Sequence, residues 1–231
     1  MPEISVIIPT YNRSHLLERA VRSVLAQIFQ DFEIIIIDDA STDDTKEMVK
    51  DKFSSELNLG IIRYVKNSAR MERSFSRNAG IKLARGRYIG FLDDDDIWMP
   101  KHLSSTLDFL HAEKDVGCVF SNYFQTTSDN PSVARLVITD ITTGKGELYR
   151  RLCIVGKLGS PCTAVLRSTV FDKVSAFNTD LSVFEDREFF SRVAMNFSVG
   201  FLAEPTVCTF LHAGSYSQPS AESKERIYQL I

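Results

Sequence analysis

Residues 88–96 read Tyr88-Ile89-Gly90-Phe91-Leu92-Asp93-Asp94-Asp95-Asp96, an apolar segment typical of a strand that ends in four consecutive aspartates. Because alternate side chains of an extended chain share a face, we expect Asp93 and Asp95 to project together from the end of this strand. Their carboxylates suit Mg²⁺ or Mn²⁺, ions that usually also hold substrate phosphates. The alternative is a solvated acidic turn that caps a helix after Pro100.

Strand-like and helical patterns alternate along the first half of the chain. Apolar strand-like segments occupy residues 4–8, 33–37, 61–65 and 88–92. Between them, one helix is predicted to begin with Ser14 as its N-cap, a second to follow the pair Ser41 and Asp44 as a capping box, and a third to span 74–84. The continuous apolar run at 34–37 predicts an α/β fold, with a mostly parallel sheet covered by helices on both faces.

Polar residues follow three of these four strands. They are Pro9-Thr10-Tyr11-Asn12, Asp38-Asp39 and Asp93-Asp94-Asp95-Asp96. Because ligands of such sheets bind beyond the carboxyl ends of the strands, we expect the three groups to meet at one crevice. Each is an ordinary turn or cap by itself, but together they favour a nucleotide-phosphate site. The absence of GxxxxGK[ST] and GxGxxG motifs disfavours an ATPase and an ordinary dinucleotide enzyme.

Composition favours a single globular domain and disfavours nucleic-acid-binding, zinc-binding and disulfide-rich proteins. The 231 residues are 44% hydrophobic, which suffices for one mixed domain with a substantial core. A net charge of −3, from 27 basic and 30 acidic residues, offers no broad attraction to nucleic acid, so we expect no nucleic-acid partner. The four cysteines are widely spaced without a CxxC pair, which disfavours a zinc site or a disulfide framework.

The sequence predicts no membrane-spanning segment. No basic-then-apolar leader opens the chain, and the aliphatic run at 34–37 is far shorter than the roughly 20 residues needed to cross a bilayer. We therefore expect a soluble, cytoplasmic protein that at most docks peripherally on the inner face of a membrane.

Four ordered motifs resemble those of the inverting family 2 nucleotide-sugar glycosyltransferases. They are residues 5–12 (SVIIPTYN), 37–45 (IDDASTDDT), 77–89 (RNAGIKLARGRYI) and 91–96 (FLDDDD). The resemblance implies a GT-A fold, with a Rossmann-like, mostly parallel central sheet flanked by helices and a mixed second half. It implies a nucleotide-sugar-binding part at 1–110, an acceptor-binding part of the same domain at 111–215 and a C-terminal helical tail at 216–231.

The resemblance also implies roles at the donor site. Pro9, Thr10 and Tyr11 would lie against the nucleoside, and Asp39 would accept a hydrogen bond from the base.

The acidic run would be the DxD motif of the family. Asp93 and Asp94 would face the donor diphosphate, and Asp95 would contact the metal directly. His212 resembles a late histidine of the family that approaches the diphosphate or metal, and we keep it as a second ligand.

Arg77 is a candidate to neutralise the diphosphate, with Arg70 and Arg73 as nearby competitors. Two positions depart from the family pattern. Ala40 stands where a glycine commonly follows the paired acids, and Asn67-Ser68-Ala69 replaces the usual Asn-x-Gly. Both departures affect the loops that would shape the donor site.

The second half offers candidates for the acceptor site. Glu185-Asp186 resembles the Glu-Asp acceptor motif of the family, and we assign Asp186 as the general base and Glu185 to acceptor binding. The alternative is that both acids merely favour a helix N-terminus. Gly159 and Ser160 resemble a loop that shapes the acceptor pocket, and Trp98 offers a face for a sugar, although a turn and core packing are their ordinary roles.

These assignments predict transfer of a single sugar from a nucleotide-diphosphate donor, with UDP favoured, to a hydroxyl of a glycan or lipid-linked acceptor. The expected setting is the biosynthesis of surface polysaccharide or glycoconjugate. An in-line displacement with Asp186 opposite the leaving group predicts inversion, aided by Mg²⁺ or Mn²⁺. One alternative is a non-catalytic nucleotide-sugar-binding protein. A nucleotidyltransferase is disfavoured because no glycine-rich basic phosphate signature is present.

Overall fold

The computed structural model describes residues 1–127, 134–138 and 140–211. Its first half alternates strands and helices, as the sequence patterns predict. The strands are β1 (Ile4–Thr10), β2 (Phe32–Asp38), β3 (Ile62–Lys66) and β4 (Tyr88–Phe91). The helices are α1 (Ser14–Leu25), α2 (Thr45–Lys52), α3 (Ser54–Asn58) and α4 (Glu72–Leu83).

The second half mixes short and long elements. Its strands are β5 (Ile97–Trp98), β6 (Val116–Thr126), β7 (Arg135–Leu136), β8 (Gly144–Lys145), β9 (Ala164–Arg167) and β10 (Ser198–Phe210). Its helices are α5 (His102–Ala112), α6 (Glu147–Ile154) and α7 (Glu185–Asn196), with 3₁₀ turns η2 (Pro161–Thr163) and η3 (Ser168–Asp172).

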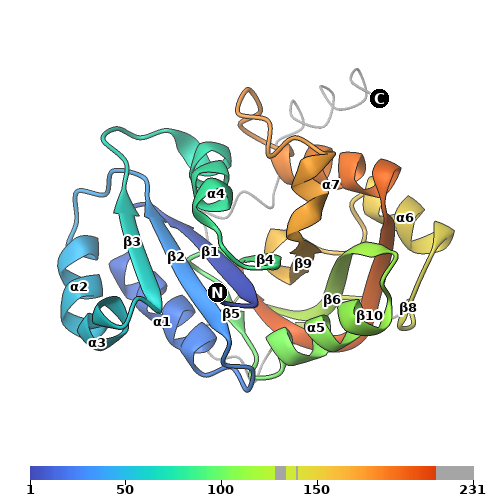
Figure 1. The fold of residues 1–231 in the computed structure, drawn as a ribbon, viewed down its shortest axis with the longest axis horizontal. Helices are drawn as coiled ribbons and strands as arrows, with labels where there is room; N and C mark the ends of the chain where they lie inside the picture. Colours follow the sequence, from blue (N-terminus) through green and yellow to red (C-terminus); the bar gives the residue numbers. More distant parts are fainter. Residues whose placement is uncertain (128–133, 139, 212–231) are drawn as a thin grey trace.

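One curved sheet joins the two halves (Figure 1). Its main order is β3-β2-β1-β4-β9-β6-β10-β5, and β7 and β8 pair with β6 and β10. The four strands of the first half run parallel, as do β6 and β10, whereas β9 is antiparallel to both β4 and β6. The predicted α/β fold with a mostly parallel sheet and a mixed second half is confirmed.

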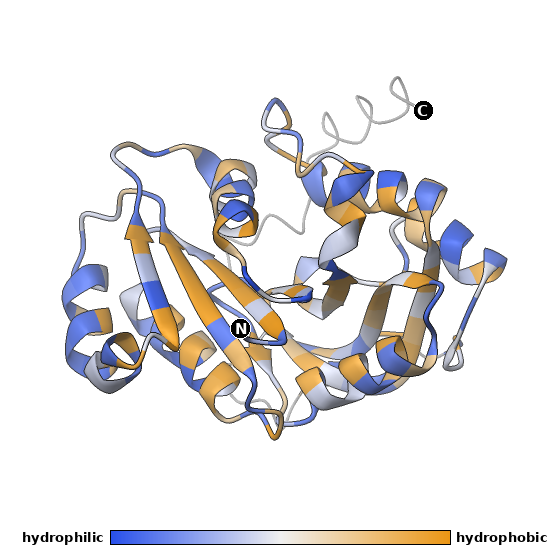
Figure 2. Ribbon diagram, viewed as in Figure 1, coloured by the Kyte–Doolittle hydropathy of each residue, from blue (hydrophilic) through white to orange (hydrophobic). Residues whose placement is uncertain are grey.

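The sheet separates two hydrophobic cores. Ile4, Val6 and Ile8 of β1 pack in one core with residues of α1 and α5, whereas Ile7 packs in the other with residues of α6 and α7. In Figure 2 the strands β1 and β2 are largely orange, while the covering helices carry blue hydrophilic residues. A strand buried on both faces explains why 34–37 is apolar without alternation. Within the described residues, no helix combines the length and the apolarity that a bilayer crossing requires.

The predicted caps of the first two helices are wrong. Arg13, and not Ser14, occupies the N-cap position of α1, and α2 begins at Thr45 without a side-chain cap bond. Ser41 instead accepts a hydrogen bond of 2.9 Å from the backbone N–H of Asn12. The loops after β1 and β2 are thereby tied to each other, so bonding between loops has displaced the local caps.

The Arg85-Gly86 pair has a structural role at the amino-terminal edge of the sheet. The backbone N–H groups of Arg85 and Gly86 donate to Ser5 Oγ at 3.1 and 2.9 Å. A Cβ on Gly86 would lie 2.5 Å from the Ser5 nitrogen, so the close approach requires glycine. Glu33 is buried beside them and accepts a bond of 2.7 Å from Arg85 Nη2. Burial favours a higher pKa for Glu33, but hydrogen bonds from Arg85 and Ser5 hold it below its ordinary value.

Candidate active site

The polar segments after β1, β2 and β4 meet at the carboxyl edge of the sheet. The N–H of Asp39 donates to the carbonyl of Thr10 at 2.9 Å, which joins the ends of β2 and β1. Thr10 Oγ1 donates to Asp94 Oδ2 at 2.8 Å, which joins the end of β1 to the acidic run after β4. Three segments that are separate in the sequence therefore form one polar edge, as parallel strand ends require.

The acidic run forms a turn and not an extended segment. The N–H of Asp96 donates to the carbonyl of Asp93 at 3.1 Å and closes it. Burial alternates along the turn. Asp94 and Asp96 are buried, whereas the side chains of Asp93 and Asp95 are 31% and 17% exposed. The less buried pair is the one that can meet a ligand.

Arginines hold three of the four carboxylates. Arg13 Nη1 lies 3.1 Å from Asp94 Oδ1 and 2.9 Å from Asp95 Oδ2, and Arg77 Nη2 lies 2.7 Å from Asp93 Oδ1. These guanidinium groups offset the repulsion within the run, which four adjacent carboxylates could not sustain alone.

The four carboxylates differ in their electrostatics. Burial raises the pKa of Asp94 to about 6, even with Arg13 beside it. Burial favours a higher pKa for Asp93, but the charge and hydrogen bond of Arg77, together with the charges of Arg73 and Arg13, lower the pKa of Asp93 below its ordinary value. Burial and the neighbouring Asp95 raise the pKa of Asp96, which accepts a hydrogen bond from the N–H of Phe210 at 3.1 Å. Asp96 therefore anchors the turn to the end of β10.

Asp39 fixes the loop that precedes α4. Its Oδ1 accepts bonds of 2.8 Å from Asn67 Nδ2 and from the N–H of Met71, and its Oδ2 accepts a third of 2.8 Å from the N–H of Glu72. The contact with a nucleoside base that the sequence predicts for Asp39 stays a prediction, and the structure adds this role in shaping the loop.

Backbone strain gathers around the same edge. Asn12, Ala40, Glu72 and Phe184 are the non-glycine residues with positive φ in the described part of the chain. Ala40, at φ 66°, keeps the left-handed conformation that a glycine would adopt at this position of the family pattern. Strained backbone persists where its surroundings hold it, and such positions are typical of ligand sites.

Pro9 lies within β1, and Tyr11 directly follows this strand. The guanidinium carbon of Arg70 is 4.4 Å from the centre of the Tyr11 ring, a cation–π distance. Pro9 is partly buried within the strand and pairs in register with Ile37 of β2. The predicted contacts of both residues with a nucleoside stay predictions.

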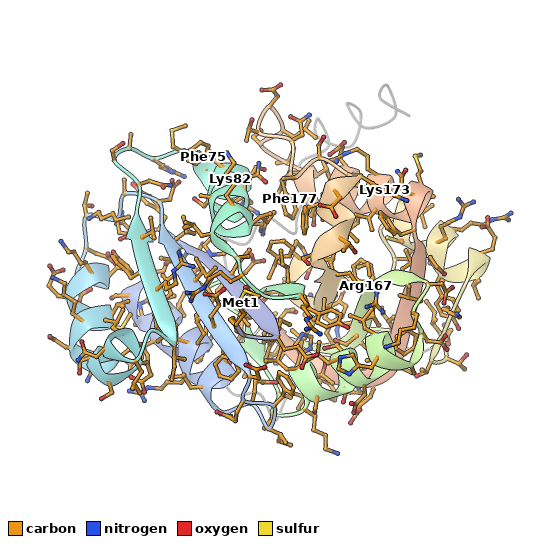
Figure 3. The ribbon with its side chains drawn as sticks, viewed as in Figure 1. Met1, Phe75, Lys82, Arg167, Lys173 and Phe177 are labelled. Carbon is orange, nitrogen blue, oxygen red and sulfur yellow. The ribbon has the colours of Figure 1, made fainter. Side chains whose placement is uncertain are left out.

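Arg77 links the two halves of the site. Its side chain is 2% exposed, and besides Asp93 it binds Glu185 through Nη1–Oε1 at 3.0 Å. Phe177 lies between α4 and α7 in Figure 3, where its backbone exchanges two hydrogen bonds with the Asn78 side chain. The predicted competitor Arg73 lies farther from Glu185, at 3.8 Å. Arg77 thus holds α4, the acidic turn and α7 together.

Glu185 and Asp186 are neighbours with different surroundings. Glu185 is 4% exposed and faces Arg77, and burial raises its pKa despite that arginine. Asp186 is partly exposed, accepts a bond of 2.7 Å from the N–H of Arg187, and lines a cavity of about 190 Å³. Gly159, predicted for the acceptor loop, lines the same cavity.

The loop at 159–163 is tightly built. Gly159 has φ 139°, and a Cβ there would lie 2.2 Å from Thr163 Oγ1. Ser160 Oγ lies 2.9 Å from Cys162 Sγ, and the Ser160 carbonyl accepts a bond of 2.9 Å from Thr163 Oγ1. Ser160 therefore shapes the loop from within, and its predicted contact with an acceptor remains a prediction.

Trp98, a predicted site residue, is not brought to this edge. Trp98 is 2% exposed, and its indole N–H donates to the carbonyl of Cys162 at 2.7 Å while its ring packs on His102. Its ring therefore belongs to the core and offers no open face to a sugar. Although Trp98 follows the acidic run in sequence, the fold buries its aromatic face. His212 and the predicted tail at 216–231 lie outside the described residues.

Sequence reasoning missed Arg13 and the arginine of α1 beside it. Arg13 bridges Asp94 and Asp95, and Arg19 Nη2 donates to the backbone carbonyl of Asp95 at 2.7 Å. The signal was present, because Arg13 directly follows the Thr10-Tyr11-Asn12 turn and so begins its helix at the edge where the acids gather.

In sequence, this chain is similar to glycosyltransferases. The model of glycosyl transferase family 2 matches residues 5–175. The UDP-Glc:α-D-GlcNAc-diphosphoundecaprenol β-1,3-glucosyltransferase WfaP of Escherichia coli is 31% identical over 94% of this chain and 80% of its own length. A GalNAc(5)-diNAcBac-PP-undecaprenol β-1,3-glucosyltransferase of Campylobacter jejuni is 38% identical over 53% of this chain, which spans 38% of that protein.

Solved structures show the same fold at lower identity. S. aureus TarS 1–349 in complex with UDP-GlcNAc superposes with a TM-score of 0.81 at 22% identity, over all of this chain and 64% of that one. The mannosyltransferase PcManGT of Pyrobaculum calidifontis, in complex with GDP-Man and Mn²⁺, gives 0.69 at 20% identity, over 93% of this chain and 59% of that one. By sequence and fold, this chain belongs to glycosyl transferase family 2 and has the GT-A fold.

Proposed function

We propose that this protein transfers a single sugar from a UDP-sugar to a hydroxyl of a lipid-linked glycan acceptor, with inversion at the anomeric carbon. The observation that carries the proposal is the Arg77 bridge. One buried guanidinium contacts both Asp93 of the acidic turn and Glu185, whose neighbour Asp186 lines the cavity.

The donor edge suits an anionic leaving group. Arg13, Arg70 and Arg73 lie around the acidic turn and the loop before α4, each partly exposed or exposed. Their positive charge can stabilise a nucleotide diphosphate as negative charge develops on it. The names of relatives that use UDP-glucose support UDP as the nucleotide.

The acidic turn fits a divalent ion of the Mg²⁺ or Mn²⁺ class. Such ions usually take one or two carboxylates and fill their other positions with water and phosphate oxygens. Asp95 and Asp93, the less buried acids, would hold the ion here. Within the described residues no three His, Cys, Asp or Glu side chains are grouped as a metal cage. When bound, the ion neutralises charge on the diphosphate.

Asp186 supplies the base. The acceptor oxygen attacks the anomeric carbon, Asp186 takes the hydroxyl proton, and the bond from that carbon to the diphosphate oxygen breaks with its electron pair on the oxygen. A sugar hydroxyl is a poor nucleophile at neutral pH, and a positioned base contributes about 10²- to 10⁴-fold to its attack. A single displacement from the face opposite the diphosphate gives inversion.

The acceptor class follows from the relatives and the cavity. The named relatives act on sugars linked through diphosphate to undecaprenol. The cavity beside Asp186 is walled largely by aromatic and aliphatic side chains, which suits an amphiphilic acceptor. An acceptor anchored in a bilayer would bring this protein to the cytoplasmic face of the membrane.

The test combines ligand binding with product analysis. A panel of nucleotide sugars is screened with Mn²⁺ for thermal stabilisation, since a ligand that binds only the native state raises its stability. The stabilising donor is then incubated with a lipid-linked sugar, and the anomeric configuration of the product is read by NMR. A β product from an α-linked donor is expected, whereas an α product, or binding with no donor turnover, contradicts the proposal.

A further inference from the structure

The cavity beside Asp186 has two charged residues in an otherwise mostly apolar lining. Its walls come from the end of α6, the loop after it, the first turn of α7 and β6. The aromatic, aliphatic and basic side chains of this lining are Phe120, Val155, Leu158, Phe184, Phe190 and Arg187. An apolar cavity with few polar groups is typical of a small-molecule site whose charges set orientation.

Arg187 is the basic residue of this lining, and its guanidinium has no acidic partner in the described part of the chain. Other arginines nearby are already paired with carboxylates. Arg77 binds two of them, and Arg192 binds Glu188 through contacts of 2.6 and 2.8 Å. Glu188, which follows Arg187, is thus unavailable to it. A guanidinium at an apolar cavity without a carboxylate partner is suited to bind an anion from a ligand.

The stem of Arg187 is packed in place. Gly156 has φ 70°, and a Cβ built on it would lie 3.4 Å from Arg187 Cδ, so the aliphatic part of Arg187 runs beside this glycine. Packing of the stem restricts the rotamers of the side chain and lowers the entropy that binding must remove. Arg187 and Asp186 line the same cavity.

From this arrangement, which rests on the proposed function, we infer that Arg187 selects an acceptor whose reacting sugar bears an anionic group next to an apolar chain. Asp186 and Arg187 are adjacent in the first turn of α7 and line the same cavity, so an acceptor that fills it can place a hydroxyl at one and an anion at the other. The anion matches a phosphate that joins the sugar to its carrier. The aromatic and aliphatic walls match the first carbons of that carrier.

A sugar carboxylate shares the anionic chemistry, so the test separates the two sources. Three probes are compared by isothermal titration at low salt: a decyl diphosphate ester of N-acetylglucosamine, neutral decyl N-acetylglucosaminide and decyl glucuronide. Each is titrated into the wild-type protein, Arg187→Ala, Arg187→Lys and the control Arg151→Ala. Arg151 is an exposed α6 residue paired with Glu147, so its loss changes the net charge equally without touching the cavity.

The wild-type protein is expected to prefer the diphosphate ester over both other probes. Loss of the charge-assisted hydrogen bonds in Arg187→Ala should weaken binding of that ester by about 10- to 100-fold. Binding of the neutral glycoside should change by less than about threefold because it makes no charge-assisted bond. Arg187→Lys should lie between, since lysine keeps the charge and loses the planar fork. Arg151→Ala should match the wild type.

Three results would overturn the inference: equal weakening of all three probes in Arg187→Ala, no preference of the wild type for the diphosphate ester, or a preference for the glucuronide. UDP titration and sugar transfer are measured on the same samples. If UDP binds and transfer occurs but Arg187 has no effect on probe choice, the inference fails and the proposed function stands. If no donor binds while Arg187-dependent ester binding persists, the proposed function fails instead.

Discussion

The donor edge and the acceptor cavity hold their carboxylates in opposite ways. At the donor edge, which the segments after β1, β2 and β4 form, Asp93, Asp94 and Asp95 each contact one of two arginines before any ligand arrives. At the cavity, Asp186 accepts a hydrogen bond from a backbone N–H, and no ion pair to it occurs among the described residues. The difference fits the proposed roles, in which the first side receives an anionic donor and the second receives a proton.

Glu185 and Asp186 show this contrast within one step of the chain. Glu185 is buried on Arg77 and belongs to the scaffold, whereas Asp186 faces the cavity. Helical geometry turns adjacent side chains by about 100°, so the two acids of one motif serve two different neighbours.

The largest effect is expected from Asp186→Asn. Loss of the base should lower kcat of transfer by about 10²- to 10⁴-fold because the acceptor hydroxyl keeps its proton. Initial rates with the donor found by screening measure this loss. Asp180→Asn, an exposed change in the loop before α7, serves as the control and should keep the wild-type rate.

The opposite result would be nearly full activity in Asp186→Asn and loss of activity in Glu185→Gln. The base would then belong to the buried acid, and the assignment of Asp186 to proton transfer would be wrong.

Arg77→Ala tests whether the two sides depend on one buried charge. Removal of this side chain leaves Asp93 and Glu185 without their guanidinium partner, and a broken buried ion pair typically costs about 3–5 kcal/mol of unfolding free energy. Urea unfolding followed by circular dichroism measures the loss. Arg85→Ala removes a guanidinium that is half exposed, and its smaller cost provides the comparison.

A loss in Arg77→Ala no greater than in Arg85→Ala would contradict the bridging role. In that case Asp93 and Glu185 would be satisfied by other groups, and the link between the acidic turn and α7 would lie elsewhere.

The smallest effect is expected on replacing Glu33. An arginine also binds this carboxylate, but at the amino-terminal edge of the sheet, away from the candidate site. Its pKa is below the ordinary value of 4.5, so the folded protein binds fewer protons at Glu33 than the unfolded chain near that pH. Its stabilisation is therefore complete above about pH 4.5 and is lost as the pH falls through the folded pKa.

Glu33→Gln should reduce the unfolding free energy by about 1–3 kcal/mol at pH 7, the usual value of a hydrogen bond to a charged group. The difference from wild type should shrink towards pH 3, measured by urea unfolding at several pH values. Transfer activity of the folded variant should stay unchanged, and a loss of donor binding would show that the two edges are not independent.

Much of this molecule could be predicted from local patterns. The strand segments and the polar strand ends were predictable because the spacing of apolar residues and the polar residues that follow each strand are local features of the sequence. The family is confirmed by the family model, which matches residues 5–175. The predicted cap at Ser41 failed because a cross-loop bond, which depends on tertiary structure, engages its side chain. Ser14 lies inside α1, and its backbone N–H donates across the loops to Asp43.

The partners of charged residues could not be predicted. Nothing near Arg77 in the sequence indicates that it reaches Glu185, 108 positions away. Trp98 was misassigned because an aromatic residue after a polar loop fits both a sugar platform and a core, and burial decides between them only in three dimensions. Arg13 was overlooked although its place at a strand end was visible.

The most direct test of the division between the two sides is UDP affinity in Mn²⁺, measured by calorimetry for Asp95→Asn and Asp186→Asn in parallel. We expect Asp95→Asn to weaken Mn²⁺-dependent binding of UDP by about tenfold or more, since a carboxylate ligand of the ion is lost, while Asp186→Asn binds UDP as the wild type does. Equal loss of affinity in both variants would contradict it.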